Sequence, residues 1–513
     1  MTEAPTRRHW TAPLVVAVLL GGLYVLLAPH TADLAAQTAR AQVFRRSGYV
    51  PYWTGWYGGT PMAGYSLVTP PLLGLFGPVW LGGLVIVASC AVAVPLLADC
   101  RRPRAAAIAV VVSGTFDVFS GRTTFATGVV VALAAVLVVE RRRPFLSFLV
   151  ALLATATSPV AGVLLALVAV ATVLAGPRRR SAAACAVIGI AVAFGVIAFL
   201  ASGSRGGYEP FTRTSLLLAV GTTLVVMLSP VGRRLRVVGW LTLWLLLACF
   251  LVHSPVGANA TRIAVLGAAP ALIAVGRWPR LVLFPAVVVA SLLACGQLVN
   301  DMSASGGAVA TRGFVTPLKE QVLAQADIYD YRVEVVAPKT HWPLTYLLPE
   351  VAVARGWERQ TDEARNEVFY GRAPLTPAAY RSFLDRNAVG YVALPSHSAL
   401  DYGSVREGAL VRSGLPYLSL IWSNADWRLY AVAHPSPIVE RMPARTPSPQ
   451  VLAADDTGFT FDVFSAGRYL VRMTWSPYLV ASGGHVSRAP YDHVWVTVPA
   501  AGHYRLRAVW RWP

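Results

Sequence analysis

Residues 1–300 consist of long apolar runs with very few charged side chains, and this feature limits the folds open to the chain more than any other. Only 13% of the whole chain is charged, whereas soluble domains carry about 25%. A helix needs about 20 apolar residues to cross a bilayer, or about 17 at the short end. The runs reach this length repeatedly, so we expect a polytopic α-helical membrane domain.

The apolar runs predict about eleven membrane spans. Seven runs stand alone and two form hairpins of two spans each: 12–28, 71–98, 182–202, 215–231, 237–253, 262–276 and 281–299, with hairpins at 105–140 and 145–176. The first run follows two arginines, as in a signal peptide, but it ends without a convincing cleavage site. We therefore expect it to be retained as the first helix.

Short arginine-rich clusters separate the spans and predict the orientation of the chain. They lie at 7–8, 101–104, 141–143, 178–180, 233–236 and 277–280. Basic residues gather on the cytoplasmic side of membrane proteins, and these clusters recur after every second span. We therefore expect a multi-pass protein of the plasma (inner) membrane with its N-terminus inside and its C-terminus outside. The net charge of +19 does not indicate nucleic-acid binding, because the basic residues form no single patch.

The region after the last span reads as ordinary globular sequence, and we expect it to be extracytoplasmic. Residues 301–440 predict an α/β domain, with strands at 332–336, 391–394, 418–422 and 427–432 and a helix at 376–387. Residues 441–513 contain only strand signals. Two Gly-x-Tyr stretches, at Gly467 and Gly502, favour a small β-sandwich there, although chance similarity between two alternating strands would look the same.

Common site motifs are missing from the sequence. All five cysteines lie in or beside apolar runs, so neither a disulfide framework nor a zinc site is predicted. No nucleotide-binding signature and no common hydrolase motif occurs. A tryptophan- and arginine-rich stretch at 355–360 would suit contact with a carbohydrate, but we favour a packing role for it.

The first outer loop, residues 29–70, holds the strongest candidates for chemistry. Asp33 follows the first predicted span directly, where an acid suits work as a general base. Trp53, Trp56 and Tyr57 alternate with glycines and suit stacking on a sugar or an isoprenoid chain. The alternatives are a helix-capping role for Asp33 and an interfacial aromatic belt for the three rings.

Two further candidate sites lie at the outer ends of spans. Asp117 and Arg122 flank the turn of the first hairpin, and the Arg122 guanidinium suits a lipid phosphate because it contacts two phosphate oxygens at once. An ion pair that only closes the turn explains these two residues equally well. Asn259 and Arg262 lie between two later spans, where they either face the same cavity or cap the following helix.

The order of these features resembles the GT-C superfamily of glycosyltransferases, which use polyprenyl-phosphate sugars. One helix is followed by a loop that begins with an acid, then by the aromatic–glycine stretch 53–61 and a Pro-Pro entry to the second span. The resemblance is closest to bacterial integral membrane proteins labelled 6-pyruvoyl-tetrahydropterin-synthase-related. It implies that Asp33 is the catalytic acid. Some related families carry two adjacent acids, whereas Leu34 follows here, which leaves open whether a divalent cation takes part; no other cofactor is expected.

The resemblance implies a membrane glycosyltransferase that moves a sugar from a polyprenyl-phosphate donor to a cell-envelope glycan or lipid. A transporter or lipid flippase is the first alternative, although such proteins place polar residues near the bilayer midplane and here these residues gather at span ends. A non-catalytic protein of envelope assembly is the second alternative. Under all three hypotheses, membrane lipids are partners of the chain.

Overall fold

The computed structural model describes residues 7–201, 207–303, 305–444 and 446–511. These residues form two compact units, each of them assembled from separate stretches of the chain. The helical unit comprises Met1–Gln37, Tyr65–Ala198 and Tyr208–Ser303. The C-terminal unit comprises Thr38–Gly64, Phe199–Gly207 and Ala304–Pro513. The central part of the first outer loop therefore groups with the C-terminal residues.

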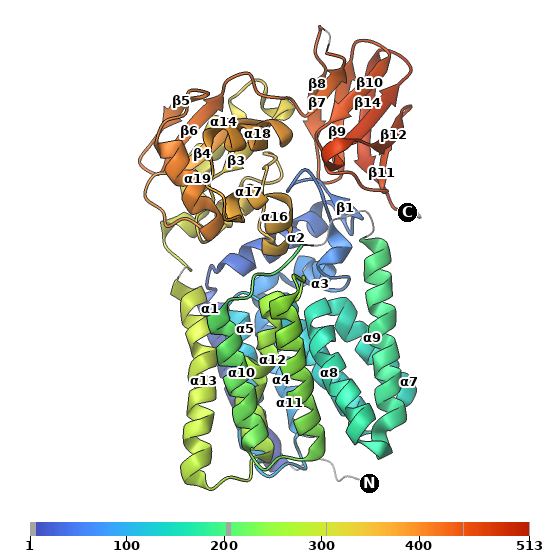
Figure 1. The fold of residues 1–513 in the computed structure, drawn as a ribbon, viewed down its shortest axis with the longest axis vertical. Coiled ribbons are helices and arrows are strands. Elements are labelled where there is room, and N and C mark those ends of the chain that lie inside the picture. The colour runs from blue at the N-terminus through green and yellow to red at the C-terminus, as the bar shows by residue number, and fades with distance from the viewer. Residues whose placement is uncertain (1–6, 202–206, 304, 445, 512–513) are drawn as a thin grey trace. The chain divides into compact units, whose positions relative to one another are not determined.

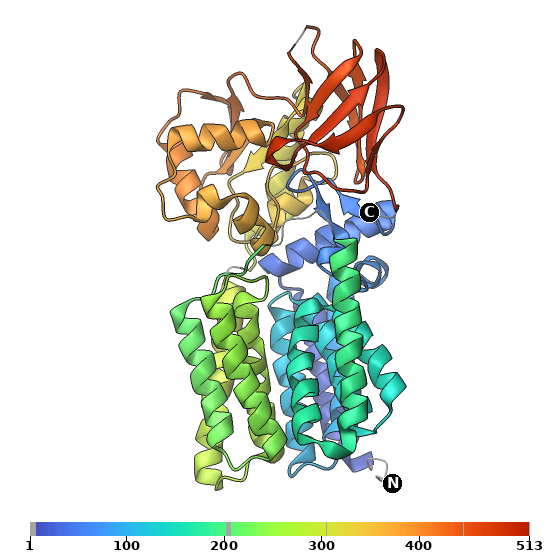
Figure 2. The same ribbon diagram turned by 45° about the vertical axis from the view of Figure 1, so that its right-hand side comes forward.

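The helical unit contains the following helices, most of which run side by side along one axis (Figures 1 and 2). They are α1 (Arg7–Leu27), α3 (Thr69–Phe76), α4 (Pro78–Leu96), α5 (Pro103–Phe119), α6 (Thr123–Glu140), α7 (Pro144–Thr157), α8 (Pro159–Ala175), α9 (Arg180–Leu200), α10 (Arg213–Leu228), α11 (Arg233–Leu251), α12 (Arg262–Val275) and α13 (Arg280–Ser303). A further helix, α2 (Ala32–Ser47), begins in this unit and continues into the C-terminal unit.

Among the described residues, seven helices are long and apolar enough to cross a membrane. Three further apolar helices, α7, α8 and α10, are shorter. The chain is therefore a multi-pass membrane protein. Ten of the eleven predicted spans contain one helix each, and the span 71–98 contains α4 and most of α3. The number of crossings and their sidedness stay predictions.

The prediction of one continuous segment at 71–98 is wrong, because a break separates α3 from α4. Gly77 has a φ of +79°, a conformation that favours glycine, and Pro78 begins the next helix. Proline lacks the N–H that would continue the first helix, and it disfavours helical geometry in the residue before it. The Gly-Pro pair was the signal for this break, and the apolar character of its neighbours concealed it.

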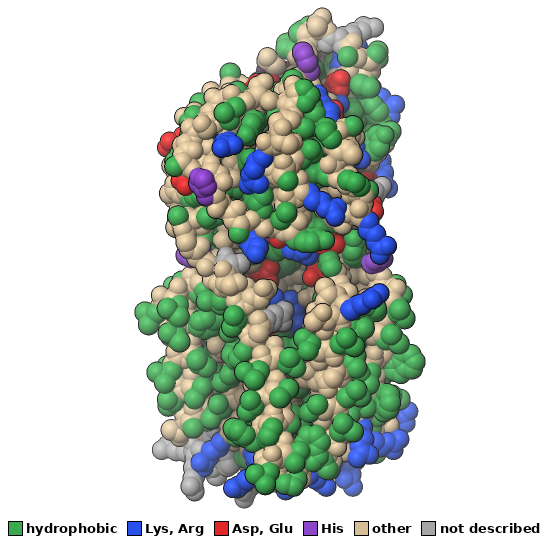
Figure 3. All heavy atoms as spheres, turned by 60° about the vertical axis from the view of Figure 1, so that its left-hand side comes forward, with side chains coloured by type: hydrophobic (Ala, Val, Ile, Leu, Met, Phe, Trp, Pro, Cys, Tyr) green, Lys and Arg blue, Asp and Glu red, His purple; other side chains and the backbone are tan. Residues whose placement is uncertain are grey.

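The surface of the helical unit is apolar along its length and basic at one end. Figure 3 shows hydrophobic side chains covering the helices and arginines gathered at one end. Large apolar side chains point outward on several helices, among them Leu19, Leu26, Trp244, Leu281 and Phe284. An apolar surface of this extent needs a lipid environment.

The first part of the C-terminal unit is an α/β fold around a mixed sheet. The sheet order is β3-β4-β6-β5, with β3 and β4 parallel and the other pairs antiparallel. Its strands are β3 (Arg332–Val335), β4 (Val389–Pro395), β5 (Leu418–Ser423) and β6 (Trp427–Val432). Its helices are α14 (Arg312–Leu323), α15 (Trp342–Tyr346), α16 (Arg359–Arg365), α17 (Glu367–Tyr370), α18 (Pro377–Arg386) and α19 (Tyr402–Arg412). All four predicted strands and the predicted helix are confirmed.

The last part of the C-terminal unit is a β-sandwich of two four-stranded antiparallel sheets, ordered β12-β13-β10-β7 and β11-β14-β9-β8. The strands are β7 (Val439–Met442), β8 (Gln450–Ala454), β9 (Gly458–Val463), β10 (Gly467–Val471), β11 (Leu479–Ala481), β12 (His485–Arg488), β13 (Val494–Val498) and β14 (Gly502–Ala508). Inward-facing residues of both sheets form one apolar core.

The two Gly-x-Tyr stretches play matching roles in the sandwich. Tyr469 lies on β10 and Tyr504 on β14, so each sheet contains one of them. Both rings are buried, and each hydroxyl donates to the backbone carbonyl four residues earlier, Ser465 in one case and Ala500 in the other. The similarity between the stretches therefore reflects equivalent structure, which confirms the predicted sandwich.

Candidate functional site

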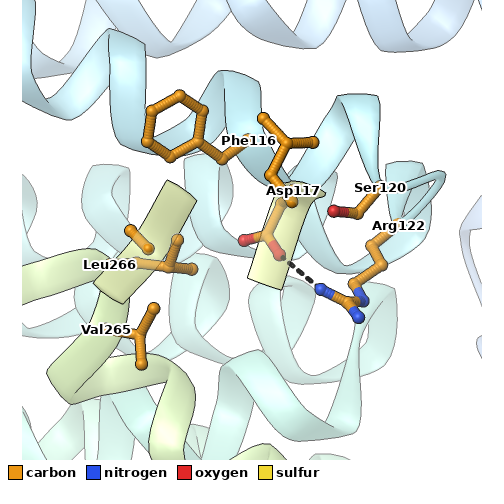
Figure 4. Close-up of a pocket in the computed structure, with 8 residues that line it drawn as sticks. Phe116, Asp117, Ser120, Arg122, Val265 and Leu266 are labelled. Atoms are coloured by element: carbon orange, nitrogen blue, oxygen red, sulfur yellow. Dashed lines mark ion pairs between the residues drawn. The ribbon is translucent and has the colours of Figure 1, made fainter. Parts of the chain in front are cut away.

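Arg122 forms the centre of an ionic cluster in the helical unit. Its Nε lies 3.1 Å from Asp33 Oδ2, and its Nη2 lies 2.9 Å from Asp301 Oδ2. Its Nη1 lies 3.8 Å from Asp117 Oδ1, and Figure 4 shows these two side chains pointing toward each other. The carboxylates come from α2, α13 and α5, so stretches far apart in the sequence meet at one guanidinium. We call these four residues the Arg122 cluster.

The Arg122 cluster is partly open. The exposed fraction of the side chain is 5% for Asp117 and 13% for Arg122, but 21% for Asp301 and 37% for Asp33. Three carboxylates surround the guanidinium, and arginine stays protonated in proteins. Arg122 is thus a permanent cation. Asp33 is the most exposed of its three acidic partners, so solvent reaches the cluster mainly through Asp33.

The order of the helices shows at which end of the helical unit the Arg122 cluster lies. α5 begins next to the basic cluster 101–104 and ends near Asp117, and α13 begins at Arg280 and ends near Asp301. Both acids therefore lie at the helix ends opposite the basic clusters. If those clusters face the cytoplasm, as predicted, the Arg122 cluster faces the outer side.

Gln37 fixes the first turn of α2 against the turn between α5 and α6. Its side chain is fully buried. Its amide donates to the carbonyl of Gly121 and, at 3.3 Å, to that of Asp33. Its carbonyl oxygen accepts from the backbone N–H and the hydroxyl of Thr124, at 2.8 and 3.0 Å. Since Asp33 lies one turn before Gln37 on α2, these bonds set the position of Asp33 relative to Arg122.

Gly121 allows α2 to approach this turn closely. It has a φ of +83°, in the left-handed region that favours glycine. A Cβ at this position would lie 2.2 Å from Thr31 Oγ1 and 2.7 Å from the backbone nitrogen of Leu34. Any other residue would therefore push away the start of α2, which carries Asp33.

A small pocket lies beside Arg122. Its empty space of about 190 Å³ includes open solvent. The residues that line it are Phe116, Asp117, Ser120, Arg122, Val265, Leu266, Ala294 and Leu298, and Figure 4 labels the first six. One end is polar and ionic, and the walls from α12 and α13 are apolar. Such a pocket suits an anionic group attached to a hydrocarbon chain.

The structure brings three of the predicted site residues together, namely Asp33, Asp117 and Arg122. Arg262 begins α12 nearby and lies over the ring of Phe125 at 4.3 Å, where its charge acts on Asp117. Asn259 lies buried in the short helix Gly257–Thr261. Among the described residues, no side-chain hydrogen bond connects Asn259 to the Arg122 cluster.

The other predicted site residues, Trp53, Trp56 and Tyr57, belong to the C-terminal unit and are buried there. Trp56 donates from its indole nitrogen to the carbonyl of Leu344 at 3.2 Å. The hydroxyl of Tyr57 accepts from the backbone N–H of Glu358 at 3.1 Å. These rings are therefore part of the packing of that unit.

Asp301 and Gln37 complete the site but were not predicted from the sequence. Asp301 follows the last apolar run by two residues, a position that an ordinary boundary residue would also occupy. Gln37 lies four residues after Asp33 on α2, hence on the same helix face. That spacing was the available signal.

Within the described ranges, no group of three or more His, Cys, Asp or Glu side chains is arranged to hold a metal ion. In the Arg122 cluster, the guanidinium lies between the three carboxylates.

No family model matches the chain, and no curated protein sequence matches it. Among solved structures, the chain is similar to ArnT from Cupriavidus metallidurans, crystallised bound to undecaprenyl phosphate. The two chains are 12% identical, with a TM-score of 0.46, and the match covers 83% of this chain and 98% of that chain. A TM-score of this size is too low to support an inference about fold or ligand.

Proposed function

We propose that this membrane protein transfers a sugar from a polyprenyl-phosphate donor to a cell-envelope glycan or lipid, as members of the GT-C superfamily do. The observation that carries the proposal is the Arg122 cluster beside a pocket with one ionic end and apolar walls. A polyprenyl phosphate has the same two-part character, an anionic head on a hydrocarbon chain. The resemblance in the first outer loop supports the same class of reaction.

In the proposed reaction, Asp33 acts as the general base. It is the most exposed acid of the Arg122 cluster, and therefore the one most accessible to an acceptor. Its carboxylate takes the proton from an acceptor hydroxyl as that oxygen attacks the anomeric carbon of the sugar. The bond between this carbon and the phosphate oxygen breaks, and the polyprenyl phosphate leaves with the electron pair.

Arg122 stabilises the negative charge that develops on the departing phosphate. A guanidinium held in advance by protein contacts needs little reorganisation when that charge appears. Asp117 holds Arg122 from its buried side, and Arg262 adds a second cation near the same end of the pocket. The proposal assigns no direct substrate contact to Trp53, Trp56 or Tyr57, which are buried in the C-terminal unit.

The experiment that tests the proposal measures release of polyprenyl phosphate from a labelled polyprenyl-phosphate sugar by the full chain in lipid nanodiscs, with envelope extract as acceptor. Asp33→Asn removes the base and keeps the shape of the side chain, so transfer falls by about 10²–10⁴-fold. Asp99→Asn, at an exposed position beyond α4, is the matched control and keeps the full rate.

Three outcomes would contradict the proposal. Full transfer by Asp33→Asn would remove the assigned base. Movement of a solute or lipid across vesicles without consumption of the lipid-linked sugar would favour a transporter or flippase. Tight binding of an envelope glycan without any turnover would favour the assembly protein.

A further inference from the structure

We infer that Asp301 is an internal competitor of the donor: its carboxylate occupies the part of Arg122 that the donor phosphate needs, and it is displaced when the phosphate binds. The inference rests on the proposed function, because it concerns regulation of the same site. It goes beyond that function by assigning the last turn of α13 as the element that admits the lipid headgroup.

The geometry of the guanidinium singles out the Asp301 position. An arginine contacts two oxygens of a phosphate through one of two forks, Nε with Nη2 or Nη1 with Nη2. Both forks include Nη2. Asp301 holds Nη2 at 2.9 Å, while Asp33 holds Nε and Asp117 lies farther away, at 3.8 Å from Nη1. Nη2 carries two N–H groups, one directed toward each fork, so a two-point contact of either kind brings the phosphate next to the Asp301 carboxylate on this nitrogen.

The balance of charges in the Arg122 cluster also indicates that Asp301 leaves when a phosphate binds. The Arg122 cluster holds three carboxylates against one guanidinium, and Arg262 supplies the second cation nearby. A phosphate added with Asp301 still in place would bring a fourth anionic group to two arginines. Like charges at such short range repel strongly inside a protein. Departure of Asp301 relieves this repulsion.

Asp301 is also the acid that moves most easily. Asp117 is buried within α5, and Asp33 lies on the turn of α2 that Gln37 fixes. Asp301 lies in the last turn of α13, where backbone carbonyls lack helical partners and helices fray. Only 18% of the apolar segment of α13 is buried, the smallest share among the seven candidate spans described.

α13 forms part of the apolar pocket wall and also carries Asp301. Ala294 and Leu298 of α13 line the pocket. Ala294, Leu298 and Asp301 follow one another at spacings of four and three residues, hence on the same helix face. Ser120 also lines the pocket. A hydrocarbon chain lying along this face of α13 would bring its headgroup to Asp301 and Arg122.

The test measures binding of a polyprenyl phosphate without sugar to the full chain in nanodiscs. Asp301→Asn keeps the size of the side chain and removes its charge, and Asp301→Ala removes both. We expect each to lower the apparent Kd about tenfold, whereas Asp301→Glu, which restores a carboxylate, binds like the parent chain. Asp99→Asn is again the control, and the melting temperature of each variant shows that it is folded.

Unchanged or weaker binding in both Asp301→Asn and Asp301→Ala would overturn the inference. Inorganic phosphate at the same concentration serves as a separate arm: we expect it to compete poorly, because it lacks the chain that fits the apolar walls, and tight binding of it would assign the site to free phosphate. Tighter lipid binding by the Asp301 variants, with no sugar transfer by any variant, would keep the competitor and reject the proposed transferase.

Discussion

The helical unit and the C-terminal unit each contain one arginine surrounded by three carboxylates, in very different settings. In the C-terminal unit, Arg355 contacts Asp362 at 2.6 Å, Glu407 at 3.0 Å and Glu334 at 3.4 Å. No side chain of this Arg355 cluster is more than 5% exposed. The Arg122 cluster has the same charges, but two of its acids reach solvent.

The neighbours of the two clusters account for the difference. Tyrosine hydroxyls hydrogen-bond the acids of the Arg355 cluster: Tyr370 donates to Asp362, and Tyr380 donates to Glu407. The Arg122 cluster instead borders a pocket. In some proteins, buried ion networks determine a unique packing. The comparison teaches that access and neighbours, rather than the charges themselves, distinguish a candidate site from a structural core.

The largest expected contrast comes from removing each arginine. Arg355→Met leaves three buried acids without their cation, so we expect the free energy of unfolding of the C-terminal unit to fall by about 3–5 kcal/mol. Arg122→Met leaves acids that are partly solvated, and we expect a smaller loss of stability together with loss of polyprenyl-phosphate binding. Chemical denaturation followed by tryptophan fluorescence checks the first, and the nanodisc binding assay the second. Equal losses of stability would remove the distinction between the clusters.

A change beside the open cluster has an intermediate effect. Gly121→Ala puts a methyl group against Thr31 and Leu34 and forces alanine to a positive φ, which costs about 1–3 kcal/mol. We expect lower stability of the helical unit and slower transfer, because the start of α2 moves with Asp33. Thermal unfolding and the transfer assay measure both.

Gly114→Ala is the matched control for this change. Gly114 lies inside α5, and a Cβ there would meet nothing within 4 Å. Alanine favours a helix over glycine, so this variant should be as stable as the parent or slightly more so. Normal transfer by Gly121→Ala would show that the close approach of α2 is not needed.

The smallest effect is a pH dependence in the closed cluster. Burial, reinforced by Glu407, raises the pKa of Glu334 well above its ordinary value of 4.5. The folded form therefore binds this proton more tightly than the unfolded form does. The resulting stabilisation is complete below pH 4.5 and is lost as the pH rises through the raised pKa.

Glu334→Gln imitates the protonated acid at every pH and should flatten this dependence. We expect the variant to match the parent at pH 4 and to exceed it by about 1–2 kcal/mol at pH 8. Denaturation curves of both proteins at several pH values provide the measurement. Parallel stability profiles for the two proteins would mean that Glu334 is ionised in the fold.

Much of the fold was predictable because the relevant signals are local. Apolar length alone locates most helices of the helical unit, and a short continuous apolar run locates the buried strand β4. It was not predictable that the central part of the first outer loop packs within the C-terminal unit. Trp56 bonds to Leu344, 288 residues later, and nothing in the sequence around Trp56 identifies that partner.

The candidate site was predictable only in part, for a similar reason. Asp33, Asp117 and Arg122 stand out because charges at the ends of apolar spans are costly and rare. Asp301 looks like an ordinary boundary residue until the packing of α13 brings it to Arg122. Gln37 is uncharged, and its importance depends on hydrogen bonds to Gly121 and Thr124, more than 80 residues away.

The C-terminal unit is assembled from separate stretches of the chain, and this has a consequence for how the protein folds during synthesis. The stretch Thr38–Gly64 leaves the ribosome before most of the membrane helices, yet its partners include Thr474, whose hydroxyl donates to the carbonyl of Tyr57, 417 residues earlier. Chains generally fold from the N-terminus as they are synthesised. Here the early segment waits until every helix of the membrane unit has been inserted. A fragment that begins near residue 301 would lack part of its own interior.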